Sequence, residues 1–209
     1  DASGNVYLTG SSTGTGYLDQ CVTIKLNSDG IMQWESLYNL PGNRESQPNG
    51  IAVDTSGNVY ITGWYNAFNN SRDGITIKYN PLGQVEWVDL MSTTGNRYEE
   101  ARDIVIDANQ QAIICGFIYD TSTAGGLNVF VKKYTTSGLE DWMQTYTNPS
   151  FLGGDKGEVI RIASNGNIIV GGQSANGTIT STDVLALSYS PTGVQQWATI
   201  YSDSTTTFD

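Results

Sequence analysis

Carboxylates and aromatic rings are the side chains with the most scope for chemistry in this chain. The 209 residues include 21 acids, 12 tyrosines and five tryptophans, but no histidine. The commonest general base and transition-metal ligand is therefore missing, and no imidazole can activate a serine, threonine or cysteine nucleophile. Glu99 and Glu100 are adjacent, so an extended backbone points them to opposite sides, whereas a glycosidase needs two converging acids. We expect no enzyme and no cofactor.

Two patterns that resemble metal sites are better explained as structure. The segment Asp54-Thr-Ser-Gly-Asn58 lacks the alternating carboxylates and the closing glutamate of a calcium loop, so it predicts a turn. Cys21 and Cys115 have no zinc-site spacing and occupy different positions of different repeats. Both are predicted to be small strand residues without a disulfide, and no metal is expected.

The overall charge narrows the classes of partner. The formal net charge is −11 and the sequence pI is about 4.2, so nucleic acid and anionic membrane surfaces would be repelled. No apolar run approaches the length that a membrane-spanning helix needs. We expect no nucleic-acid partner and no membrane span.

An internal repeat sets the elements that position these side chains. Residues 54–63 restate residues 1–10, and diverged copies follow at 107–116 and 163–172. A tryptophan recurs in step, each time eight residues after a leucine or tyrosine: Trp34, Trp87, Trp142 and Trp197. The period of 53 to 56 residues lies in the range of propeller blades. The tryptophans are predicted to pack between neighbouring blades.

Each repeat resolves into four short strands, called A to D here. In the second copy they are predicted at 51–53, 59–62, 75–79 and 85–90, because these segments are β-branched or aromatic and are bounded by turn residues. Tandem four-stranded meanders are typical of an all-β fold, the β-propeller. The predicted blades span approximately 1–50 (lacking its first strand), 51–103, 104–159 and 160–209.

The spacing within the repeat distinguishes two ends of the blade. The interval from the start of predicted strand A to the glycine that ends strand B is always 12 residues. The interval from the last residue of strand C to the strand D tryptophan is always eight. The B–C and D–A intervals vary, and in an up-and-down blade these two connections share one end. Because variable loops on a fixed scaffold carry function, this end is the predicted binding surface. Its candidate residues are aromatic rings and acids that suit a glycan or a protein segment: Trp64, Tyr65, Phe68, Asp73, Tyr98, Phe117, Tyr119 and Asp120.

These motifs resemble a known family. Residues 1–10, residues 22–30 and Gln33-Trp34 are similar to the bacterial seven-bladed β-propeller repeat (SBBP repeat), and the second copy matches as well. Copies three and four depart from the pattern at Gln110-Gln111 and Ala163, which leaves their turn geometry open. The strand C–turn–strand D segment at 187–197 also resembles the docking motif of quinoprotein-type propellers, a likeness that concerns blade packing alone.

The resemblance implies a secreted or cell-surface bacterial protein without an assigned activity. Seven blades would close the ring, so we expect an incomplete propeller whose remaining blades lie outside this segment or in an associated copy. The leading hypothesis is a non-catalytic binding or scaffold module. Two alternatives stay open: a domain acting on extracellular polysaccharide, and a structural subunit of a surface layer or filament.

Overall fold

The computed structural model describes residues 1–13, 18–42, 44–67, 71–91, 98–120, 126–150, 154–175 and 182–202. Within these ranges the chain forms 15 strands in four antiparallel sheets, which confirms the all-β prediction. The same residues contain no helix with the length and apolarity to cross a membrane.

Every sheet is a meander in which consecutive strands pair. The first sheet has three strands, β1 (Val6–Thr13), β2 (Asp19–Leu26) and β3 (Met32–Tyr38). The second sheet has four, β4 (Ser46–Val53), β5 (Val59–Asn66), β6 (Arg72–Tyr79) and β7 (Val85–Met91). The third contains β8 (Glu99–Ile106), β9 (Ala112–Asp120), β10 (Gly126–Tyr134) and β11 (Glu140–Tyr146). The fourth contains β12 (Lys156–Ile162), β13 (Ile168–Ala175), β14 (Thr182–Tyr189) and β15 (Gln195–Tyr201).

The strands extend further toward the B–C and D–A connections than their apolar pattern indicates. Strand A of the second sheet begins at Ser46 rather than Ile51, and backbone pairing of strands B and C continues to Asn66 and Arg72. The side chains in these extensions are mostly polar, so the alternation of apolar residues stops while the ladder continues. Positions assigned to loops therefore lie on strands.

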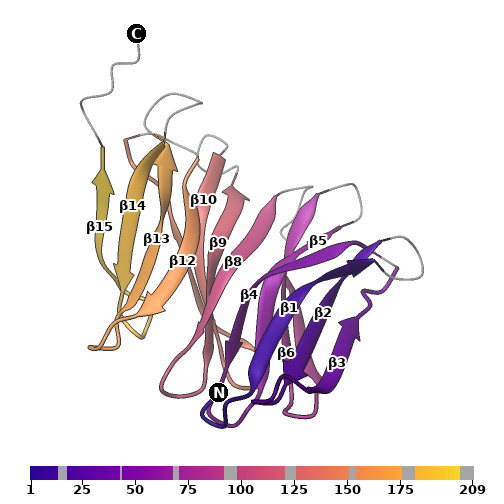
Figure 1. The fold of residues 1–209 in the computed structure, drawn as a ribbon. Coiled ribbons are helices and arrows are strands. Elements are labelled where there is room, and N and C mark those ends of the chain that lie inside the picture. The colour runs from indigo at the N-terminus through magenta and orange to yellow at the C-terminus, as the bar shows by residue number, and fades with distance from the viewer. Residues whose placement is uncertain are drawn as a thin grey trace.

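The sheets are arranged as successive layers (Figure 1). The first strands of the second, third and fourth sheets, β4, β8 and β12, lie next to one another along one edge of the stack. The sheet of β1–β3 and the sheet of β12–β15 stand at opposite ends, and the described residues form no closed ring.

Alternate residues of an inner strand enter different cores. On β5, Val59 and Ile61 pack in the core between the first and second sheets, whereas Tyr60 packs in the core between the second and third. A third core, with Ile113, Val131 and Leu187, joins the third and fourth sheets. The middle strands β5 and β6 are consequently buried on both faces, while most residues of β15 are exposed and β1 is exposed at alternate positions of its first half.

A tryptophan contact, which we call the tryptophan joint, connects each sheet to the next. The indole Nε1 of Trp34 donates a hydrogen bond of 3.0 Å to the carbonyl of Pro81 in the C–D turn of the second sheet. The equivalent bonds from Trp87 and Trp142, to Thr136 and Pro191, measure 3.3 and 3.4 Å. The prediction that these tryptophans pack between neighbouring blades is confirmed.

A glycine completes each joint. Gly83, Gly138 and Gly193 have φ angles of 79°, 87° and 83°, and a Cβ at these positions would lie 2.6 to 2.7 Å from the indole ring of the preceding sheet. Only glycine combines the left-handed backbone with this close approach of an indole.

The constant spacing of 12 residues also has a physical cause. The first strands carry irregularities between Pro48 and Gly50 and at equivalent places in β8 and β12. There the strand A carbonyl approaches strand B so closely that a Cβ on Gly63, Gly116 or Gly172 would lie about 2 Å from the oxygen. A bulge opposite a glycine therefore fixes the register of the A–B hairpin.

The A–B connection is the predicted turn. Both Asp54 carboxylate oxygens accept hydrogen bonds from the turn, including the N–H groups of Ser56 and Asn58 at 2.9 Å. The diverged copies keep the turn: Gln110 takes the left-handed conformation usually occupied by glycine (φ 61°), and Gly166 donates to the Ala163 carbonyl at 2.8 Å.

Candidate functional site

The predicted binding residues gather at the ends of strands in the second and third sheets. Trp64 and Tyr65 lie on β5, Asp73 on β6, and Tyr98 immediately before β8. Phe117, Tyr119 and Asp120 lie on β9; Phe68 and the side chain of Asp120 are outside the described residues. The structure brings Tyr98 and Tyr119 together, because the N–H of Tyr119 donates to the Tyr98 carbonyl at 2.9 Å.

Burial divides the predicted residues into two groups. Trp64, Tyr65, Asp73 and Phe117 are 3 to 5% exposed, so they belong to the packed interior and not to a loop surface. Tyr98 and Tyr119 are 41% and 37% exposed and are available to a ligand. The rings of Trp64 and Phe117 are enclosed, so replacing either by a small side chain would leave a cavity.

Arginines cover the buried rings. The Arg72 guanidinium lies 3.9 Å from the centroid of the Trp64 ring and 5.7 Å from that of Tyr98, and Arg102 lies 5.2 Å from that of Phe117. The arginine side chains are 37% and 32% exposed. Such distances correspond to cation–π contacts. We call Trp64, Arg72, Tyr98, Glu100, Arg102 and Phe117 the arginine–aromatic cluster.

Glu100 holds this cluster together. Its carboxylate is almost fully buried and pairs with Arg72 at 3.5 Å and with Arg102 at 3.0 Å. The side-chain amide of Asn49, in the neighbouring sheet, donates to the same carboxylate at 3.3 Å. A buried acid shared by two partly exposed arginines positions both guanidinium groups through charge-assisted contacts. The cluster thus joins the second and third sheets.

Two further acids at this end, Asp73 and Asp155, are also buried. The Tyr65 hydroxyl donates to Asp73 at 3.3 Å, and burial together with the Asp73 charge raises the pKa of Tyr65 to about 12. Burial raises the pKa of Asp155, although its carboxylate accepts the Asn148 N–H at 2.7 Å. An accessible acid does adjoin the cluster: the Glu158 side chain is 40% exposed and lies 3.5 Å from Arg102.

The arginines are the residues that sequence reasoning missed. Arg72 stands beside Asp73, and Arg102 follows Glu100 by two positions, in an extension of the strand beyond its apolar pattern. Lys156 also lies 5.1 Å from the centroid of the Phe117 ring, from the fourth sheet. An arginine within a few residues of an acid and a ring is the available signal, because Arg72 and Trp64 lie on paired strands of one sheet and so do Arg102 and Phe117. The contact of Arg72 with Glu100 joins two sheets and is not visible within one repeat.

A groove runs along the first strands of three sheets. It has a volume of about 470 Å³ and is walled by Ile51, Ala52, Val53, Asp103, Ile104, Val105, Ile106, Arg161 and Ile162. Apolar side chains dominate it, apart from an ion pair of 2.6 Å between Asp103 and Arg161. Its polar groups are therefore engaged with each other.

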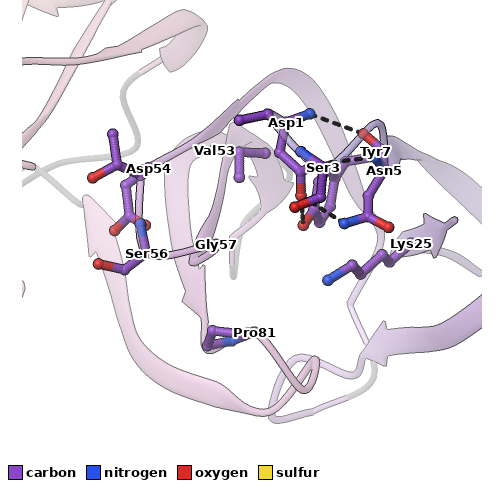
Figure 2. Close-up of a pocket in the computed structure, with 12 residues that line it drawn as sticks. Asp1, Ser3, Asn5, Tyr7, Lys25, Val53, Asp54, Ser56, Gly57 and Pro81 are labelled. Carbon is purple, nitrogen blue, oxygen red and sulfur yellow. Dashed lines mark hydrogen bonds between the residues drawn. The ribbon is translucent and has the colours of Figure 1, made fainter. Parts of the chain in front are cut away.

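A cleft of about 450 Å³ opens at the opposite end, between the A–B turns of the first two sheets (Figure 2). Its carboxylates serve their own turns: Asp1 accepts hydrogen bonds from Ser3, Asn5 and Tyr7, and Asp54 is bound in the same way. Lys25 lies over the Tyr7 ring at 5.3 Å. Because the carboxylates of Asp1 and Asp54 already accept hydrogen bonds within their turns, the cleft is a weaker candidate for a ligand-binding site than the arginine–aromatic cluster.

The two cysteines have no part in either site. Cys21 on β2 and Cys115 on β9 are free and fully buried, as predicted for small strand residues. Burial raises the pKa of the Cys21 thiol to about 11 and that of Cys115 further, so neither is a thiolate at neutral pH.

Four tandem antiparallel meanders, joined by a repeated tryptophan contact, are blades of the β-propeller class. A family model described as a beta-propeller repeat matches residues 42–67, which contain strands A and B of the second sheet. The predicted resemblance to this repeat is thereby confirmed. No curated protein matches the chain.

Proposed function

We propose that this chain is a non-catalytic binding or scaffold module that holds its ligand at the B–C/D–A end of the blades. The observation that carries the proposal is the arginine–aromatic cluster, in which partly exposed Arg72 lies 5.7 Å from the centroid of the exposed Tyr98 ring and shares the Glu100 carboxylate with partly exposed Arg102. Exposed tyrosines beside fixed arginines provide stacking and directional hydrogen bonds, which are common in contact surfaces for protein segments and glycans.

The same cluster supports a non-catalytic role. The Glu100 carboxylate is occupied by two arginines and Asn49. Glycoside hydrolysis requires two carboxyl groups free to act on one bond, whereas four acids of this end, Asp73, Glu99, Glu100 and Asp155, are buried, and the exposed Glu158 is paired with Arg102. A polysaccharide-active domain is therefore the less supported alternative.

We further propose that the module belongs to a larger propeller of a secreted or cell-surface bacterial protein. The beta-propeller repeat at residues 42–67 supports this setting, and seven blades is the number that the resemblance implies. The open stack of four sheets supports the addition of further blades.

A paired substitution tests ligand binding. Replacing both Tyr98 and Tyr119 by serine removes exposed rings without opening a core, so the melting temperature should stay within a few degrees while binding falls at least tenfold. Glycan-array binding and capture of extracellular proteins are the readouts. The control is Leu82→Ser with Leu139→Ser, which changes two exposed apolar side chains in the C–D turns at the other end. Equal binding by both variants would contradict the proposal.

A further inference from the structure

The guanidinium of Arg72 is held by its face and is open along its edge. It lies 3.9 Å from the centroid of the Trp64 ring, and the side chain is 37% exposed. Within the described part of the chain, its only polar contact is an ion pair of 3.5 Å between Nη1 and the Glu100 carboxylate. Because a guanidinium has five N–H donors, most of this edge has no acceptor among those residues. An arginine fixed in this way is prepared to bind a carboxylate with two parallel hydrogen bonds.

The charges of the cluster do not cancel. Arg102 lies 3.0 Å from the Glu100 carboxylate that Arg72 shares, and 3.5 Å from that of Glu158. Lys156 adds a third cation, 5.1 Å from the centroid of the ring that Arg102 also covers. Three cations therefore face two carboxylates, which leaves one positive charge at this place. The surplus is local, since the formal net charge of the chain is −11.

The nearby buried acids Asp73 and Glu99 act on a different ring. Asp73 follows Arg72 on β6, so its side chain points to the opposite face of the strand. There it accepts the hydrogen bond of the Tyr65 hydroxyl. Burial, the Asp73 charge and, to a smaller extent, the Glu99 charge raise the pKa of Tyr65 to about 12, and Arg44 lies 5.7 Å from the centroid of the same ring. These acids consequently belong to the surroundings of Tyr65 and not to the open edge of Arg72.

An exposed ring lies beside that edge. The Tyr98 ring is 5.7 Å from the Arg72 guanidinium and is 41% exposed. Tyr119, at 37% exposure, is joined to it through the backbone hydrogen bond between the two residues. A tyrosine combines a flat apolar face with a hydroxyl, and both suit the ring and the hydroxyl groups of a sugar. The surface thus offers a stacking face next to a carboxylate-binding edge.

We propose that the ligand of this end is a glycan that carries a single acidic sugar, with its carboxylate on the N–H edge of Arg72 and its ring against Tyr98. This inference rests on the proposed function and names its class of ligand. A uronic acid presents a ring face and a carboxylate within one residue, as the neighbouring tyrosine and arginine require, whereas an acidic peptide supplies the carboxylate without the ring. One acidic sugar matches the single surplus charge, and the net charge of −11 opposes a polyanion.

Calorimetric titration of the intact chain with two matched probes, in about 0.15 M salt, tests the proposal. One probe is a β-1,4-linked glucose tetrasaccharide whose non-reducing end is glucuronic acid, and the other is the same tetrasaccharide ending in glucose. We expect the acidic probe to bind roughly tenfold tighter, because charge-assisted hydrogen bonds exceed neutral ones. Arg72→Gln should abolish this preference, and Arg72→Lys should keep only part of it, since an ammonium group lacks the planar fork.

The matched control is Arg161→Gln. It removes the same charge from an arginine that is 68% exposed in the groove along the first strands, so the preference for the acidic probe should stay as in the parent. The preference is a ratio of two affinities measured on one variant. A variant that is partly unfolded weakens both affinities alike and leaves this ratio unchanged, which separates loss of the fold from loss of carboxylate recognition.

Three outcomes would overturn the inference. Equal affinity for the two tetrasaccharides would do so while leaving the binding module in place. Binding of a peptide of alternating alanine and glutamate, with neither tetrasaccharide bound, would assign the surface to a protein ligand. Binding of none of these probes would also reject an acidic sugar, and the proposed function would then be decided separately by the paired Tyr98 and Tyr119 substitution on the glycan array and in the capture of proteins.

Discussion

At the scale of single residues, the strand B glycines Gly63, Gly116 and Gly172 leave no room for a Cβ beside the strand A carbonyl. A Cβ on Gly116 would lie 2.0 Å from the oxygen of Glu100 and 2.9 Å from the Cα of Ala101. Both atoms belong to the backbone of a buried strand and cannot move aside. The first sheet has no strand at this place, and Gly10 has nothing within 4 Å.

This difference makes a matched pair of substitutions informative. Gly116→Ala should lower the free energy of unfolding by at least about 2 kcal/mol, because the methyl group forces β8 away from β9. Gly10→Ala should change it by no more than about 0.5 kcal/mol. Urea denaturation of both variants measures the difference. Equal losses would mean that the close approach of the strand A carbonyl is not what requires glycine.

The sequence predicts the type of a residue's role better than its exposure. The sequence predicts that four aromatic residues lie at the B–C/D–A end of the blades, and the structure places all four there: Tyr98, Tyr119, Trp64 and Phe117. Their exposure differs because an arginine on the paired strand of the same sheet covers Trp64 and Phe117. Glu100 of the third sheet also pairs with Arg72 of the second, and the pattern of one repeat does not contain this contact between sheets.

At the scale of the element, the A–B turn shows how many hydrogen bonds a single aspartate accepts. Asp54 accepts hydrogen bonds from two backbone N–H groups, from Asn58 and from the Tyr60 hydroxyl. In the fourth sheet Ala163 stands at this place, and the turn keeps the N–H of Asn167 bonded to the Asn165 side chain at 3.0 Å. The fold of the turn survives, with fewer side-chain bonds.

Restoring the acid should therefore stabilise the protein. Ala163→Asp provides acceptors for the N–H groups of Asn165 and Asn167, and we expect a gain of about 1 kcal/mol in the free energy of unfolding. The reverse change, Asp54→Ala, should cost a similar amount or more, because the Tyr60 hydroxyl also loses its acceptor. Thermal and urea unfolding are the measurements. A neutral or destabilising Ala163→Asp would show that Asn165 already replaces the carboxylate fully.

The elements themselves are well predicted because each hairpin is encoded locally. The 12- and eight-residue spacings correspond to a bulge opposite a glycine and to a turn that receives a tryptophan. The ends of the strands are not predicted, because the ladder is continued there by polar residues such as Asn66 and Arg72, which do not extend the apolar alternation. The turn at Gln110 is also hard to predict, because a glutamine stands where the other copies have glycine. Gln110 takes the left-handed conformation, and its backbone N–H donates to the carbonyl of Asp107 as that of Gly57 does to Asp54.

At the scale of the whole molecule, the stack of sheets behaves as a linear array in which each sheet contacts only its neighbours along the chain. The inner sheets are buried on two faces and the end sheets on one. Stability should therefore fall from the middle of the stack to its ends, as in other repeat proteins.

Hydrogen exchange should reveal this gradient. Amides of β5, β6, β9 and β10 should exchange slowest, and those of β1, β3 and β15 fastest. Mass spectrometry of peptic fragments resolves the strands. Uniform protection across all four sheets would indicate that the molecule unfolds as one unit and that the end faces are covered.

The tryptophan joint has a consequence for how such a chain can change length. Every joint uses the same two parts, so the joint itself does not restrict which sheets of the repeat are neighbours. Duplication or loss of one period of 53 to 56 residues, cut at equivalent positions, replaces one joint by an equivalent one. The number of blades is thereby open to change by unequal recombination within a gene, while the tryptophan contact between neighbouring blades is kept.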